Sequence, residues 1–179
     1  MEPAAMVRCA HSLMHALKED LAERGQVEPV FVLLLPRCCD LIAYDPTLLT
    51  SIAGKRAIAV NLRRKATERR AEGAPIAVDS FCFVPDPEAI RGVNQKLVQA
   101  AAAAGIDALV AAGLGRKIEA ISVNLQTSDF HLLLQQPYTR ESSIVFGERT
   151  TIDSRDYGNL SVISGGIFDI FPLRRMAEA

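Results

Sequence analysis

An acid and a base separated by one residue, Asp129 and His131, form the pair in this sequence that is best suited to chemistry. Residues two apart on a strand project to the same side, so this carboxylate and imidazole could exchange a proton as a catalytic pair. Glu119 or Glu148 on a neighbouring strand could complete such a site. Polar residues on an exposed sheet face explain the same pair without any chemistry, and this is the more economical interpretation.

A strongly basic helix is the second chemical signal, predicted from about residue 53 to 71 and ended by a glycine at 73. Residues 53–73 hold seven basic and two acidic residues, a net charge of +5, whereas the whole chain has a formal net charge of −1. The candidate anion-binding residues are Arg56, Arg63, Arg64 and Arg70. Such a cluster can bind phosphates, but this helix has no aromatic residues and no nucleic-acid-binding signature accompanies it. A solvated helix, or one facing an acidic partner surface, is therefore favoured over a nucleic-acid site.

The first predicted helix offers a candidate metal site, because His11 and His15 are four residues apart and Glu19 follows four residues later. Two histidines at this spacing can share a metal ion. No glutamate follows His11 directly, and no third histidine is near in sequence. A solvated polar helix face is favoured, and we expect no metal.

Two adjacent cysteines, Cys38 and Cys39, fall at the tip of a predicted hairpin. Arg37 would favour a reactive thiolate there, whereas Asp40 would oppose it. Free cysteine is one of the most frequently buried residues, so a packing role is favoured over a redox or nucleophilic role.

Composition restricts the remaining possibilities. The chain has 179 residues, which suits one domain, and its four cysteines show no C-x-x-C spacing. The first ten residues lack the pattern of a secretory signal, no segment is apolar enough to suggest a membrane span, and reduced thiols would fit the cytoplasm. Motifs for hydrolases, metalloproteases, nucleotides and zinc fingers are absent from the sequence, so no cofactor is expected.

The firmest structural signal lies in residues 117–152, which predict an antiparallel meander of three strands. Ile121, Val123 and Leu125 alternate with polar residues, as in a strand with one dry face. A second strand is predicted over 130–136, after a turn at 127–129, and a third over 144–152. The remaining predicted elements are a helix at 4–24, a hairpin of strands 30–35 and 40–44, the basic helix, a strand at 76–84, a helical insertion at 86–116 (helices 88–104 and 106–112) and a last hairpin within 160–171. This order predicts a single α+β domain over residues 1–179 with a largely antiparallel sheet.

These patterns favour a small cytoplasmic, non-catalytic binding protein that forms a homodimer through its sheet. The strands at 130–136 and 167–171 are apolar on both faces, and a second copy of the chain would cover the face that helices on one side leave open. One alternative is a small enzyme with a pocket between the sheet and the helical insertion, using His131, Asp129 and either Cys82 or Tyr138. The other is a nucleic-acid or anion-binding module that uses the basic helix. No membrane partner is expected.

Overall fold

The computed structural model describes residues 1–91, 93–156 and 171, and within them the chain forms one antiparallel sheet. The strand order is β2-β1-β3-β4-β5-β6, and β7 also pairs with β5. The strands are β1 Val30–Leu34, β2 Cys39–Ile42, β3 Gly73–Pro85, β4 Gly115–Thr127, β5 His131–Arg140, β6 Ile144–Phe146 and β7 Thr150–Asp153. The helices are α1 Pro3–Arg24, η1 Pro46–Thr50, α2 Ile52–Glu68, α3 Pro87–Ile90, α4 Gln95–Ala104 and α5 Ile106–Ala111. The predicted α+β class is confirmed.

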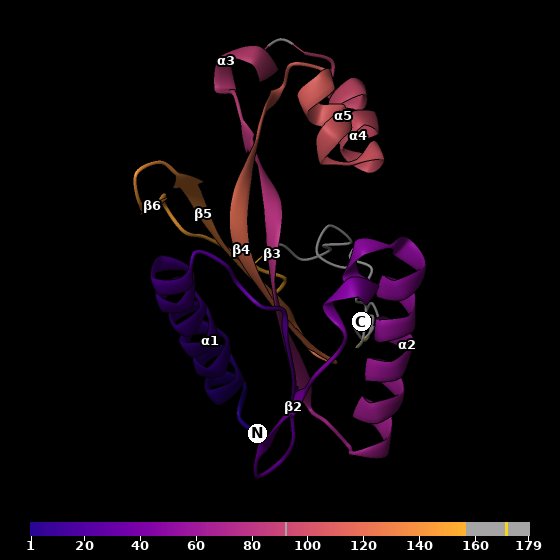
Figure 1. Ribbon diagram of the computed structural model, residues 1–179. Coiled ribbons are helices and arrows are strands. Elements are labelled where there is room, and N and C mark those ends of the chain that lie inside the picture. The colour runs from indigo at the N-terminus through magenta and orange to yellow at the C-terminus, as the bar shows by residue number, and fades with distance from the viewer. Residues whose placement is uncertain (92, 157–170, 172–179) are drawn as a thin grey trace.

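Helices α1 and α2 lie on opposite faces of the sheet (Figure 1). On one face, α1 packs its buried residues against the apolar residues of β4 and β5. On the other face, Ile58 and Leu62 of α2 pack against Phe31 of β1 and Ile76 of β3. The expectation that helices cover a single face was wrong, because β1 and β3 carry apolar side chains on both of their faces. Among the described helices, none is both long and apolar enough to cross a membrane.

The start of α2 is fixed by a close contact with η1. The Ser51 side chain accepts a 3.0 Å hydrogen bond from the Gly54 backbone N–H and caps the helix. A Cβ atom at Gly54 would overlap the backbone carbonyl of Leu48, so only glycine lets the two segments meet. This contact holds the start of α2 against η1.

The dry face predicted for β4 is confirmed, since Ile121, Val123 and Leu125 are all fully buried beneath α1. Strand β5 is central, as expected, with β4 on one side and β6 and β7 on the other. The predicted third strand over 144–152 is divided into β6 and β7, which pair with different parts of β5. The predicted last hairpin lies outside the described residues, apart from Phe171.

The helical insertion lies between β3 and β4, at the end of their long ribbon and away from α1 and α2 (Figure 1). The helix predicted over 88–104 is divided into α3 and α4, because Arg91 is extended and the Asn94 side chain accepts from Lys96 N–H at the start of α4. Asp107 of α5 forms a 2.8 Å ion pair with Lys117 of β4, whose ammonium group also lies 4.4 Å from the ring centre of Phe81.

Candidate functional site

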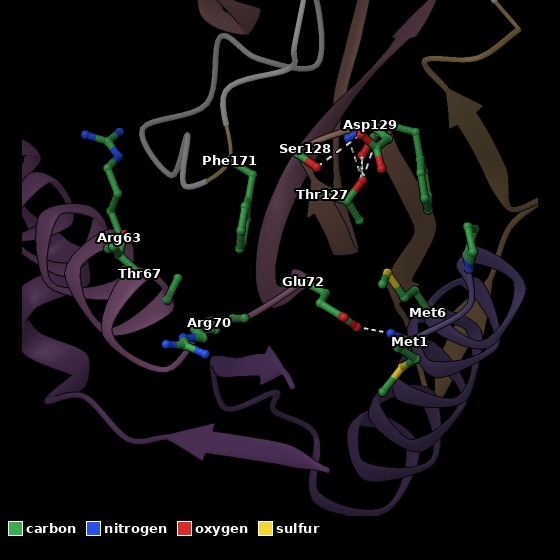
Figure 2. A pocket seen from close by; sticks show the side chains of 14 residues that line it. Met1, Met6, Arg63, Thr67, Arg70, Glu72, Thr127, Ser128, Asp129 and Phe171 are labelled. Atoms are coloured by element: carbon green, nitrogen blue, oxygen red, sulfur yellow. Dashed lines mark hydrogen bonds and ion pairs between the residues drawn. The ribbon is translucent and has the colours of Figure 1, made fainter. Parts of the chain in front are cut away.

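A pocket of about 700 Å³ opens where the start of α1, the end of α2 and the β4–β5 turn meet (Figure 2). Residues from these three places, together with Phe171, form its walls. The lining residues are Met1, Pro3, Met6, Arg63, Ala66, Thr67, Arg70, Ala71, Glu72, Thr127, Ser128, Asp129, Phe130 and Phe171. The volume lies within the range of sites that bind small molecules.

One wall is cationic and comes from the end of α2. Arg63 lies in the last two turns of the helix, and Arg70 follows its C-terminus. The backbone of Arg70 has φ 54°, the left-handed conformation that reverses the chain after a helix. Its N–H bonds to the Thr67 carbonyl at 3.2 Å. The turn that ends α2 therefore places Arg70 at the pocket, at some cost in backbone strain.

The opposite wall is a tightly hydrogen-bonded turn. The buried Thr127 hydroxyl donates to the Phe130 carbonyl at 2.7 Å and accepts from the Phe130 N–H at 2.9 Å. Ser128 donates from its hydroxyl to the Asp129 carboxylate at 3.1 Å. In Figure 2, Arg63, Thr67 and Arg70 lie on one side of Phe171, and Ser128 and Asp129 lie on the other. The turn thus holds a carboxylate and a hydroxyl across the pocket from the arginines.

Apolar side chains fill the space between these walls. Met6, Ala66, Phe130 and Phe171 all line the pocket. The Arg155 guanidinium lies over the Phe130 ring, 4.2 Å from the ring centre. Glu72 at the pocket edge forms an ion pair with the amino group of Met1. The pocket therefore combines a cationic wall, a hydrogen-bonding wall and an apolar lining.

The predicted acid–base pair is divided between two environments. Asp129 lines the pocket, whereas His131 is fully buried behind it and donates a 2.8 Å hydrogen bond from Nε2 to the Phe171 carbonyl. Asp129 belongs to the turn and β5 begins only at His131, so the strand alternation behind the prediction does not extend to Asp129. In the structure, His131 supports a pocket residue and does not itself line the pocket.

The other residues proposed for an enzyme site lie elsewhere. Tyr138 is buried on the α1 face, where its hydroxyl donates to Asp79. Cys82 is near the distal end of β3, and Glu119 pairs with Arg140. Burial raises the pKa of the Cys82 thiol above its ordinary value. None of these side chains belongs to the described lining of the pocket.

The structure brings two of the four candidate anion-binding arginines to the pocket, Arg63 and Arg70. Arg64 bonds to Glu68 at 2.8 Å and, with Arg63, lines a shallower hollow of about 380 Å³ on the outside of α2. Arg56 lies about two helical turns before Arg63 and outside the lining of both hollows.

The histidine pair on α1 is exposed in part and makes a weak contact. His15 Nε2 lies 3.7 Å from the Glu19 carboxylate, and both side chains are largely exposed. Partial burial, and then the nearby charge of Arg149, lower the pKa of His11. Within residues 1–91, 93–156 and 171, no three metal-ligating side chains are grouped to hold an ion.

The packing role favoured for Cys38 and Cys39 was wrong, because both are exposed where the edge strand β2 begins at Cys39. Burial, and then the nearby Cys39, raise the pKa of the Cys9 thiol. Its thiolate is therefore disfavoured, and Cys9 packs as an apolar side chain beside the α1 core.

Several pocket residues could not be identified from the sequence. Met6, Thr67 and Phe171 have no motif around them, whereas the candidate residues Arg63, Arg70 and Asp129 and the turn formers Thr127 and Ser128 stood out locally. No known protein family, curated protein or solved structure matches the chain. The geometry of the pocket therefore carries the functional argument.

Proposed function

We propose that this protein is a non-catalytic binding protein whose pocket accepts a small ligand with an anionic group. One observation carries the proposal: Arg63 and Arg70 reach the same 700 Å³ pocket that the Thr127–Asp129 turn closes from the other side. Guanidinium groups bind carboxylates and phosphates in a planar, two-point manner. An anion on the ligand would therefore bind at the α2 wall.

The opposite wall indicates what else the ligand carries. An ionised Asp129 carboxylate only accepts hydrogen bonds, so it would select an amine or hydroxyl donor. The side chains of Phe130 and Phe171 would pack against an apolar body between the two polar ends. A small carboxylate or phosphate compound that also bears a donor group fits these three surfaces.

Binding without catalysis is favoured by the side chains that are present. The described lining contains neither histidine nor cysteine. The Ser128 hydroxyl donates to a carboxylate but has no histidine beside it that could act as a base. An acid–base site at Asp129 and His131 would need His131 to leave its buried contact with Phe171. Anion binding would instead use Arg63 and Arg70, which already line the pocket.

The substitution Arg70→Gly tests the proposal, because it separates binding from folding. Glycine adopts the left-handed conformation without strain, so the variant should keep its stability or gain about 1 kcal/mol while it loses the guanidinium. A panel of small carboxylates and phosphates, inorganic phosphate included, would be screened by thermal shift and titration calorimetry.

At least one compound should stabilise the wild type and bind at least tenfold more weakly to Arg70→Gly. Arg56→Gln, which removes a charge from the same helix outside the pocket, should bind like the wild type. If no compound in the panel binds the wild type, or if both variants lose affinity equally, the proposal is wrong.

We also propose that two copies associate through the edge of the sheet. Helix α2 already covers the second face at β1 and β3. Among the described strands β2 lies at the edge of the sheet, so this edge is the better place for a second copy. Leu41 on this strand is 69% exposed. An unpaired edge with an apolar side chain is a template for pairing with another strand.

Size-exclusion chromatography with light scattering tests this association. The wild type should have a dimer mass at high concentration, and Leu41→Lys should shift it to the monomer, because a charged lysine blocks edge pairing. A wild-type monomer at all concentrations would contradict it. The pocket proposal does not depend on this result.

A further inference from the structure

We propose that the solvent-facing side of α2 binds an acidic amphipathic helix of a partner protein. The buried side of α2 consists of Gly54, Ile58, Ala59, Leu62 and Ala66. We call the opposite side the outer face. Its central members are Ile52, Ala53, Arg56, Ala57, Val60 and Arg64.

The outer face is unusually apolar for a surface helix. Ile52 and Val60 are 62% and 63% exposed and lie on one stripe, roughly 12 Å apart along the axis. Ala53 and Ala57 are also exposed beside that stripe. Single exposed apolar residues are common, but here four lie within the first three turns of one helix, and the small alanines would let another helix approach closely.

A recess adjoins this stripe. The hollow of about 380 Å³ is lined by Val60, Arg63, Arg64, Thr67 and Glu68. It has an apolar side chain at one edge and guanidinium groups around it. A large apolar side chain of a partner would fit beside Val60, with its neighbouring carboxylates near the arginines.

Charge determines the kind of partner. Arg56 lies on the stripe between Ile52 and Val60, and among the described residues it has no hydrogen-bond or ion-pair partner. A helix that covers Ile52 and Val60 must also cover this guanidinium, which is costly unless a carboxylate pairs with it. The partner should therefore alternate large apolar residues with Asp or Glu on its contacting face.

The same arrangement makes a nucleic acid or a membrane a less suitable partner for the outer face of α2. Helix α2 has no aromatic residue on which bases could stack, and exposed Ile52 and Val60 would contribute nothing to a phosphate backbone. Insertion into a membrane would carry Arg56 below the surface along with the two apolar residues on its stripe. A protein helix can place a carboxylate opposite Arg56 and meets neither difficulty.

The full-length protein can be tested with a fluorescein-labelled peptide of about six helical turns, with leucines at i, i+4 and i+8 flanked by glutamates. A second peptide carries lysine at every glutamate. Fluorescence polarisation should show that the acidic peptide binds at least tenfold more tightly than the basic one. Arg56→Glu and Val60→Gln should each reduce this affinity at least tenfold, and Arg56→Glu should improve binding of the basic peptide.

Arg91→Glu, the same charge change at the residue that follows α3 in the insertion, should leave the affinity unchanged, and circular dichroism should show that every variant is folded. Equal binding of the acidic and basic peptides, or no binding of either, would overturn the proposal. Selective binding to single-stranded RNA or to phosphatidylglycerol vesicles that Val60→Gln does not weaken would also overturn it. These outcomes leave the pocket proposal untouched, because neither Arg56 nor Val60 lines the pocket.

Discussion

The Tyr138 hydroxyl on β5 donates a 2.8 Å hydrogen bond to a carboxylate oxygen of Asp79 on β3, across the intervening strand β4. Arg140 donates to the same hydroxyl at 3.2 Å and, through a second nitrogen, to the Gly25 carbonyl at the end of α1 at 2.6 Å. Together with the ion pair between Arg140 and Glu119 of β4, this network ties the end of α1 to three strands. Burial and the Asp79 carboxylate raise the pKa of Tyr138 to about 12, from an ordinary value of 10.0.

The raised pKa of Tyr138 predicts a loss of stability in alkali. The unfolded chain releases the tyrosine proton near pH 10 and the folded chain only near pH 12, so the free energy of unfolding should fall as the pH rises between these values. The loss should reach about 2–3 kcal/mol at most. Urea unfolding from pH 8 to pH 12 measures it. Tyr138→Phe should be less stable at pH 8 and show a smaller alkaline loss; an unchanged loss would contradict the assignment.

Gly54→Ala should destabilise the protein by about 2 kcal/mol or more, although alanine is the better helix former. The added methyl group would overlap the Leu48 carbonyl and push η1 away from α2. Thermal and urea unfolding measure the change. Ala57→Gly, at an exposed position of the same helix, should cost only about 1 kcal/mol. Equal costs at the two positions would mean that the contact with η1 is not tight.

His131→Ala should both destabilise the fold and weaken the pocket. The Phe171 carbonyl would lose its hydrogen-bond donor, at a cost of about 1–3 kcal/mol. Because Phe171 lines the pocket, anion affinity should fall even though His131 does not line it. His131→Gln, which keeps a side-chain donor, should restore part of both properties. If stability falls and affinity does not, His131 is a core residue without influence on the site.

Replacement of residues 86–114 by Asn-Gly should leave the sheet and the pocket intact. Pro85 and Gly115 are direct partners across the ribbon, and Asn-Gly closes such a pair in a two-residue turn. Outside the insertion, α5 packs mainly on β3 and β4. The shortened chain should fold cooperatively and bind the same anions, as urea unfolding and calorimetry would show. Loss of the fold would mean that the insertion contributes to the main core.

The sequence predicted the sheet well where one local pattern was sufficient. Alternation at Ile121, Val123 and Leu125 identified β4 and its buried face, and the turn formers after β4 identified the loop that carries Asp129. Local patterns in the sequence were not sufficient to predict the pocket. The meeting of the α2 terminus with this loop is a long-range contact, and no periodicity in the sequence reports that Arg70 lies opposite Asp129.

The expectation that Asp129 and His131 lie on one strand was wrong for a related reason. Alternation assigns side chains to faces only inside a strand, and β5 starts after Asp129. The placement of α2 on the second face was also missed, because the apolar residues of β1 and β3 indicate that both faces are covered but not by which element. The residue types that could bind an anion or exchange a proton were identified from the sequence. The residues that each of them contacts depend on the tertiary fold and were not.

Strand β3 has a further consequence for local stability. Its first five residues, from Gly73 to Ala77, are buried, whereas the part from Asp79 to Pro85 is exposed or half-buried except for Cys82 and, among the described strands, pairs with β4 alone. Amide protons near Ile76 should therefore exchange with solvent only on global unfolding, while those near Phe83 exchange through small local openings. One continuous strand would thus show two levels of protection from hydrogen exchange. The helical insertion at its far end would be held by the less protected half of the strand.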